Sequence, residues 1–134
     1  LCRINIKKLL KKGKTKIGVV FNLDNHDEDG SHWVSFFCDF NKNGIYYFDS
    51  YGYNPNKEVK VLVKRLQDQG KKLNKDLKFY INKNRHQYKN SECGVYSMNF
   101  IIRLLRGEGF AKISESKVID DEINKCRAVY FSKK

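Results

Sequence analysis

The sequence predicts an α+β domain in which a mainly antiparallel sheet packs on a central helix. Short β-branched or aromatic segments come before most of the helical ones, with no regular alternation of strand and helix, which favours this class over a parallel α/β sheet. Residues 93–105 are apolar on nearly every side, as expected of a buried helix. With 134 residues, 40% hydrophobic and 13% aromatic, the chain suffices for one core and not for two. We therefore expect residues 1–134 to form a single domain.

Four segments have the pattern of strands. Residues 16–21 and 77–81 are short runs rich in β-branched, apolar and aromatic side chains. Residues 32–40 and 45–49 are rich in aromatic side chains, and residues 41–44 between them read Asn-Lys-Asn-Gly. Because Asn and Gly tolerate the positive φ of a tight turn, we expect these two strands to be antiparallel neighbours.

Four other segments have the spacing of helices. A short helix over residues 4–12 should end at Gly13, since glycine commonly terminates a helix. A longer helix should end near Gly70, and its apolar face consists of Val59, Leu62, Val63 and Leu66. Residues 93–105 form the buried helix, and residues 114–131 predict a final amphipathic one.

The net charge is +12, from 27 Lys and Arg against 15 Asp and Glu. Such an excess attracts polyanions such as nucleic acid or acidic protein surfaces, although lysines spread along a whole chain also serve as a solubilising surface. No apolar stretch approaches the ~20 residues that cross a bilayer, and the start lacks a secretory signal. Because the chain begins at Leu1 and not at Met, we expect it to be a piece that lacks N-terminal residues.

The four cysteines are irregularly spaced in a chain large enough to fold without disulfides: Cys2, Cys38, Cys93 and Cys126. We therefore expect reduced thiols and an intracellular setting. No Cys pair or Cys/His cluster has zinc-finger spacing. Counted from Asn25, the loop at residues 24–30 opens like an EF-hand, but the twelfth position is Phe36 in place of a bidentate Glu. The sequence therefore predicts neither a metal nor a cofactor.

Cys93 is the most informative single position. It lies where a polar loop meets the first turn of the buried helix, and the positive end of a helix dipole favours a thiolate over a thiol. Gly94 beside it leaves the sulfur sterically open. A core cysteine is the alternative interpretation, and position alone does not decide between them.

A nucleophilic cysteine needs a base, and the base needs a third group that holds its tautomer. If residues 32–40 pair with residues 45–49, the start of one strand lies beside the end of the other, so His32 and Asp49 should meet at one edge of the sheet. As an alternative, Asp49 is only a turn residue that accepts local N–H bonds. Gln87, six residues before Cys93, could supply a side-chain amide to an oxyanion, although a surface glutamine is the simpler interpretation.

Taken together, these blocks resemble the superfamily of SUMO and ubiquitin-like-protein proteases and adenovirus-type cysteine peptidases. The order His, Asp, Gln, Cys matches, as do the Trp after the His and the acidic-Cys-Gly triplet. The blocks are His32-Trp33, Phe48-Asp49-Ser50, Gln87 and Asn90-Ser91-Glu92-Cys93-Gly94-Val95-Tyr96. The resemblance spans residues 32 to about 100.

The resemblance implies a papain-like site in circularly permuted order. By this analogy His32 is the general base, Asp49 orients it and Cys93 is the nucleophile, while Gln87 and the Cys93 N–H form the oxyanion hole. Family members cut after Gly-Gly or Gly-X in a narrow tunnel, so Trp33 would cover the substrate backbone, and Gly94 would also contact substrate.

The segment before His32 is shorter than the helical lobe of eukaryotic SUMO proteases, and only 17 residues separate His32 from Asp49. Both features look more like proteases of large DNA viruses, which process virion precursors. We therefore expect a protein substrate, either a viral precursor or a ubiquitin-like modifier, and a location in the cytoplasm, nucleus, viral factory or virion, with no membrane partner.

Two other functions stay open at the level of sequence. Effector acetyltransferases use a similar His, acidic, Cys order to pass an acetyl group from coenzyme A. A basic module that binds nucleic acid would use the +12 charge. Trp33 and Gln87 favour the peptidase.

Overall fold

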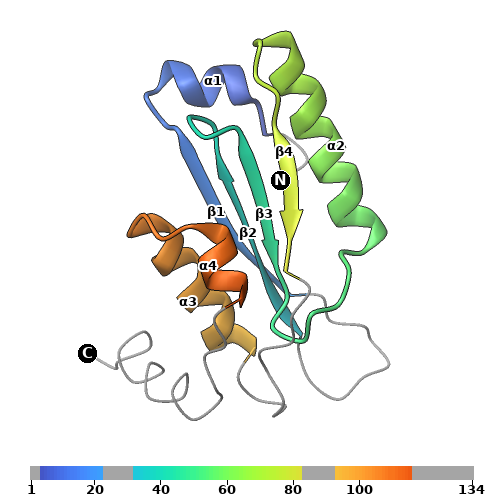
Figure 1. Ribbon diagram of the computed structural model, residues 1–134. Coiled ribbons are helices and arrows are strands. Elements are labelled where there is room, and N and C mark those ends of the chain that lie inside the picture. Colours follow the sequence, from blue (N-terminus) through green and yellow to red (C-terminus); the bar gives the residue numbers. More distant parts are fainter. Residues whose placement is uncertain (1–3, 23–31, 83–92, 116–134) are drawn as a thin grey trace, which may run out of the picture.

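The computed structural model describes residues 4–22, 32–82 and 93–115 (Figure 1). Its centre is a four-stranded sheet with the strand order β1-β2-β3-β4. The strands are β1 (Lys16–Asn22), β2 (Trp33–Asp39), β3 (Gly44–Phe48) and β4 (Lys78–Ile81). The helices are α1 (Ile6–Lys11), α2 (Lys57–Lys72), α3 (Cys93–Leu105) and α4 (Phe110–Glu115).

The sheet is mainly antiparallel, as the sequence predicts. β2 pairs antiparallel with both β1 and β3, whereas β4 pairs parallel with β3 after the chain crosses over through α2. In the tight turn between β2 and β3, Asn43 adopts a positive φ of 52°. The Asp39 carboxylate accepts hydrogen bonds from the N–H groups of Asn41 and Lys42, which holds this turn closed.

The sheet is covered on both faces, so its strands are apolar on both sides. Alternate residues of β2 and β3, such as Phe36 and Tyr47, pack with α1 and α2 in one core. Their sequence neighbours, such as Phe37 and Phe48, pack with α3 and α4 in a second core. Figure 1 shows the two pairs of helices on opposite sides of the sheet.

Helix α2 ends close to Gly70, as predicted, although the glycine itself is not the stop. α2 continues through Gly70 to Lys72, because Gly70 serves for close packing and not as a stop. A Cβ at this position would lie 2.9 Å from the Lys75 carbonyl oxygen. The chain turns instead at Asn74, which has a φ of 58°.

The last described helix, α4, has no counterpart among the helices predicted from the sequence. α4 begins at Phe110, and Phe110 and Ile113 pack against the core under α3. Residues 116–131 of the helix predicted over residues 114–131 lie outside the described part of the chain. Among the described helices, none is long and apolar enough to cross a membrane.

Candidate active site

A histidine and a carboxylate meet at one end of the sheet, where β2 starts and β3 has just ended. His32 Nε2 lies 2.8 Å from Asp49 Oδ2, across the hairpin register that pairs Ser35 with Phe48. An ionised carboxylate can only accept, so Nε2 donates. The Asp49 side chain is 2% exposed and that of His32 is 22% exposed, so the carboxylate is buried behind a ring that reaches solvent. The expected meeting of His32 and Asp49 is confirmed, while their chemical roles stay predictions.

The main chain around Asp49 is held by hydrogen bonds on several sides. Asn82, which is 1% exposed, accepts from the Asp49 N–H through Oδ1 at 2.8 Å and donates to the Asp49 carbonyl through Nδ2 at 2.7 Å. The second carboxylate oxygen, Asp49 Oδ1, accepts from the Tyr51 N–H at 2.8 Å, and the Asp49 carbonyl also accepts from the Gly52 N–H at 2.8 Å. These bonds fix the carboxylate in the direction of the ring of His32.

Two tyrosines form an aromatic wall next to the histidine. The ring of Tyr51 lies 5.1 Å from that of His32, and Tyr53 stacks on Tyr51 with ring centroids 5.6 Å apart. Tyr53 is 60% exposed, so the wall continues from the histidine into solvent. The wall limits the orientations open to the ring of His32.

Helix α3 brings its first turn toward the same end of the sheet (Figure 1). Phe100 of α3 stacks on Phe48, the residue before Asp49, with ring centroids 4.8 Å apart. Val95 and Tyr96 are buried in the same core as Phe48. The backbone of Cys93, the first residue of α3, therefore belongs to a turn that is anchored beside the segment carrying Asp49.

The remaining sequence-predicted site residues are described to different extents. Trp33 opens β2 beside His32 and is 37% exposed, and by strand alternation it belongs to the face that α3 covers. The side chain of Cys93 and the surroundings of Gly94 lie outside the described part of the structure, as does Gln87.

Sequence reasoning missed Asn82, Tyr51 and Tyr53. A polar residue directly after a predicted strand was the available signal for Asn82, but the parallel partner of that strand was not predicted. The tyrosines follow Asp49 closely in sequence, yet nothing in their spacing indicates a stack on a histidine.

Cys38 provides a contrast to a reactive thiol. It is a free cysteine with 0% exposure in the core between the sheet and α1 and α2. Burial, together with the nearby Asp39, raises the pKa of the Cys38 thiol to about 12. Cys38 is therefore inert at neutral pH, as expected of a core cysteine.

The described residues contain no group of three or more His, Cys, Asp or Glu side chains that could hold a metal ion. The groups at this end of the sheet that are suited to acid–base and nucleophilic chemistry are the histidine, the carboxylate and the cysteine that opens α3. In its fold and in the order His, Asp, Cys along the chain, the domain falls in the class of cysteine peptidases. The chain belongs to the Ulp1 protease family, whose C-terminal catalytic domain matches residues 8–130.

Viral proteins are among its relatives. The chain is 43% identical over 132 residues to a candidate thiol protease of Acanthamoeba polyphaga mimivirus, covering 98% of this chain and 44% of that protein. It is 31% identical over 127 residues to a protein of African swine fever virus named SUMO-1 cysteine protease, covering 92% of this chain and 46% of that protein. The chain thus spans about half the length of the curated relatives that it matches.

Solved structures agree with the fold. A crystal structure of the African swine fever virus protease superimposes with a TM-score of 0.83 at 30% identity, covering 90% of this chain and 46% of that one. The SUMO protease Ulp1 has the same fold, with a TM-score of 0.56 at 21% identity, covering 82% of this chain and 53% of that one. The comparisons lend no support to nucleic-acid binding.

Proposed function

We propose that this chain is the catalytic part of a cysteine endopeptidase that cleaves peptide or isopeptide bonds after Gly-Gly or Gly-X sites. The observation that carries the proposal is the 2.8 Å hydrogen bond from His32 Nε2 to the buried Asp49 carboxylate, at the end of the sheet toward which α3 presents its first residue, Cys93. Membership of the Ulp1 protease family supports it.

In the proposed reaction, the imidazole of His32 acts through Nδ1, because Nε2 is used by Asp49. Nδ1 takes the proton from the Cys93 thiol, and the thiolate attacks the scissile carbonyl carbon. The Gln87 amide and the Cys93 N–H stabilise the resulting oxyanion. His32 then gives its proton to the leaving amine, which leaves a thioester on Cys93. Water hydrolyses this thioester with His32 again as base, which restores the thiol and releases the carboxylate product.

The narrow cleavage preference would come from the residues around this centre. Trp33 is half-exposed at the start of β2 and would cover the substrate backbone, and Gly94 would leave room for it beside the nucleophile. Because larger side chains would clash under such a cover, glycine is expected on the acyl side of the cleaved bond.

Two kinds of substrate fit this preference: precursors of viral structural proteins and ubiquitin-like modifiers. The name of the African swine fever virus relative refers to SUMO-1, which supports the second kind. A SUMO-1 precursor and a set of peptides with Gly-Gly-X and Gly-X-Gly sites, incubated in parallel with the protein, distinguish a modifier-specific enzyme from one that reads only the short site.

The test of the chemistry uses a Gly-Gly peptide with an electrophilic vinyl sulfone at its C-terminus. We expect one covalent adduct, on Cys93, found by mass spectrometry of the digested protein. Cys93→Ser should abolish both the adduct and peptide turnover while leaving the circular dichroism spectrum unchanged. Cys126→Ser is the matched control and should retain both. Labelling of another cysteine in preference to Cys93, or turnover by Cys93→Ser, would contradict the proposal.

A further inference from the structure

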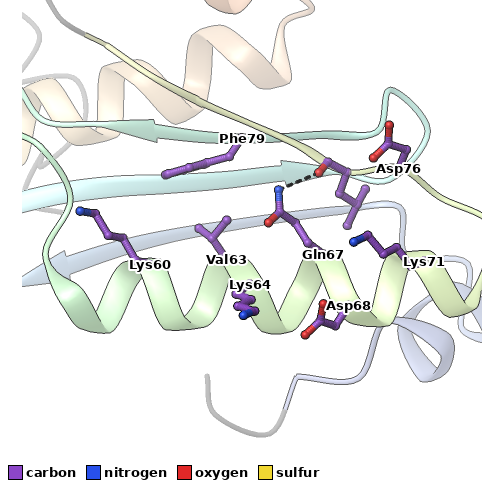
Figure 2. Close-up of a pocket in the computed structure, with 9 residues that line it drawn as sticks. Lys60, Val63, Lys64, Gln67, Asp68, Lys71, Asp76 and Phe79 are labelled. Carbon is purple, nitrogen blue, oxygen red and sulfur yellow. Dashed lines mark hydrogen bonds between the residues drawn. The ribbon is translucent and has the colours of Figure 1, made fainter.

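A groove with a volume of about 440 Å³ lies between α2 and β4 (Figure 2). One wall is a face of α2, and the other is formed by the approach to β4 and by β4 itself. Figure 2 shows Lys60 and Phe79 at one end of the groove, Lys71 and Asp76 at the other, and Gln67 between them. The groove belongs to the α2 side of the sheet and uses none of the residues proposed for catalysis.

β4 is the last strand of the described sheet, so one of its edges has no described strand beside it. The N–H groups of Lys78 and Asn82 donate to β3 and its flanks, at the carbonyls of Asn43 and Tyr47. Because main-chain groups alternate along a strand, the N–H and C=O groups of Phe79 and Ile81 point to the outer edge. Such a row of main-chain donors and acceptors is a template for pairing with an added strand.

The two halves of this edge differ in whether α2 binds their main-chain groups. The outward carbonyl of Leu77 accepts a hydrogen bond from Gln67 Nε2 at 2.9 Å, so α2 itself occupies the edge there (Figure 2). Among the described residues, none forms a hydrogen bond with the outward N–H or C=O groups of Phe79 and Ile81. An added strand therefore has its main-chain partners at Phe79 and Ile81.

The two acidic side chains of the groove follow the same division. Lys60, at the Phe79 end, and Lys64, one turn further along α2, are exposed, and neither forms an ion pair within the described residues. The acidic side chains of the lining, Asp68 and Asp76, lie with Lys71 in the half that Gln67 closes (Figure 2). The open half of the edge is thus flanked by lysines.

We propose that this open edge binds an extended, acidic segment of a protein partner by strand addition. The segment pairs its main chain with Phe79 and Ile81, and its carboxylates face Lys60 and Lys64. From Lys60 to Gln67, α2 rises by about 10 Å, which equals roughly three residues of extended chain. This is a short contact of the kind that β-augmentation uses, with affinity from the main chain and selectivity from the flanking side chains.

The test uses a fluorescein-labelled peptide of alternating Glu and Val as the probe, with anisotropy as the readout. We expect saturable binding, and a peptide with Lys in place of every Glu should not bind. The double variant Lys60→Glu/Lys64→Glu should weaken binding about tenfold, which corresponds to about 1.4 kcal/mol. Arg65→Glu is the matched control, because Arg65 is exposed on α2 but does not line the groove, and it should change the affinity less than about twofold.

Amide hydrogen exchange locates the contact. Bound peptide should slow exchange of the Phe79 and Ile81 amides and leave that of Tyr80, which faces β3, unchanged. Absence of binding at millimolar peptide overturns the proposal, as does an equal loss of affinity in Arg65→Glu. Slow exchange of the Phe79 and Ile81 amides in the free protein also overturns it, since the edge would then be covered by the chain itself.

Discussion

Asn82 is expected to hold the Asp49 carboxylate in place, and Asn82→Ala is the sharpest test of how the candidate site is built. The Asn82 amide accepts from the Asp49 N–H at 2.8 Å and donates to the Asp49 carbonyl at 2.7 Å. Both residues are 1% exposed, so water cannot readily replace the missing amide. The variant therefore leaves a buried main-chain N–H without an acceptor.

The expected loss of free energy of unfolding in Asn82→Ala follows from its two hydrogen bonds taken separately. The Asp49 carbonyl keeps the hydrogen bond from the Gly52 N–H, so the loss on that side is the net value of one bond, about 0.5–1.5 kcal/mol. The Asp49 N–H has no second partner among its described contacts, and an orphaned buried donor costs about 1–3 kcal/mol. The sum is about 1.5–4.5 kcal/mol, or a fall in Tm of roughly 6–18 °C at about 4 °C per kcal/mol for a domain of this size.

Urea denaturation gives the free energy of unfolding, and amide exchange gives the local effect. We expect exchange of the Asp49 amide to become faster in Asn82→Ala. Asn56→Ala is the control: Asn56 caps α2 by accepting from the Val59 N–H at 2.9 Å, and its loss should cost about 1 kcal/mol without changing exchange at Asp49. A loss in Asn82→Ala no larger than in Asn56→Ala, or unchanged exchange at Asp49, would refute the reasoning.

Three further predictions follow from single groups. Cys38, with a pKa raised to about 12, should resist iodoacetamide at pH 8 until the protein is unfolded, and rapid labelling in the native state would contradict its burial. The Tyr47 hydroxyl is buried with no hydrogen-bond partner among the described residues, so Tyr47→Phe should raise the free energy of unfolding by about 1 kcal/mol in urea titrations, whereas a loss would reveal a partner. The hydrogen bond from Arg103 lowers the pKa of Glu108 below its ordinary value of 4.5. The contribution of the Arg103–Glu108 hydrogen bond to the free energy of unfolding is therefore complete above pH 4.5. It is lost as the pH falls through the lowered pKa of Glu108. Glu108→Gln should thus be less stable than the native chain near neutral pH and equal to it in acid, as measured by thermal unfolding across pH.

The local part of the site could be predicted from the sequence. A turn of Asn and Gly between two aromatic strands fixes the hairpin register, and that register alone brings His32 beside Asp49. The start of α3 at Cys93 agrees with the position predicted from the apolar run. Each of these inferences depends on residues that are close in the chain.

The non-local part could not be predicted. β4 pairs parallel with β3 across the whole of α2, and no residue pattern in the two strands specifies that partner. For this reason the role of Asn82, 33 residues from Asp49, and the open edge at Phe79 were not foreseen. The sequence pattern does not reveal α4 either, because the ring contact of Phe110 with Tyr46 joins residues 64 positions apart in the chain.

The chemistry of the Asn82 side chain explains why it suits this position. An amide carries a donor and an acceptor on one rigid group, so it can bind both main-chain groups of Asp49, whereas a carboxylate could only accept. The Asn82 N–H itself donates to the Tyr47 carbonyl, so its main chain continues the β3–β4 ladder and its side chain extends that ladder by one residue. Asp49 is thereby held as rigidly as a strand residue while its own side chain remains directed at His32. Gln in place of Asn82 would retain both groups but move them outward by one methylene. Asn82→Gln should therefore destabilise the protein, although less than Asn82→Ala. If Asn82→Gln is instead as stable as the native chain, hydrogen-bonding capacity alone holds Asp49, and the exact placement of the amide does not matter.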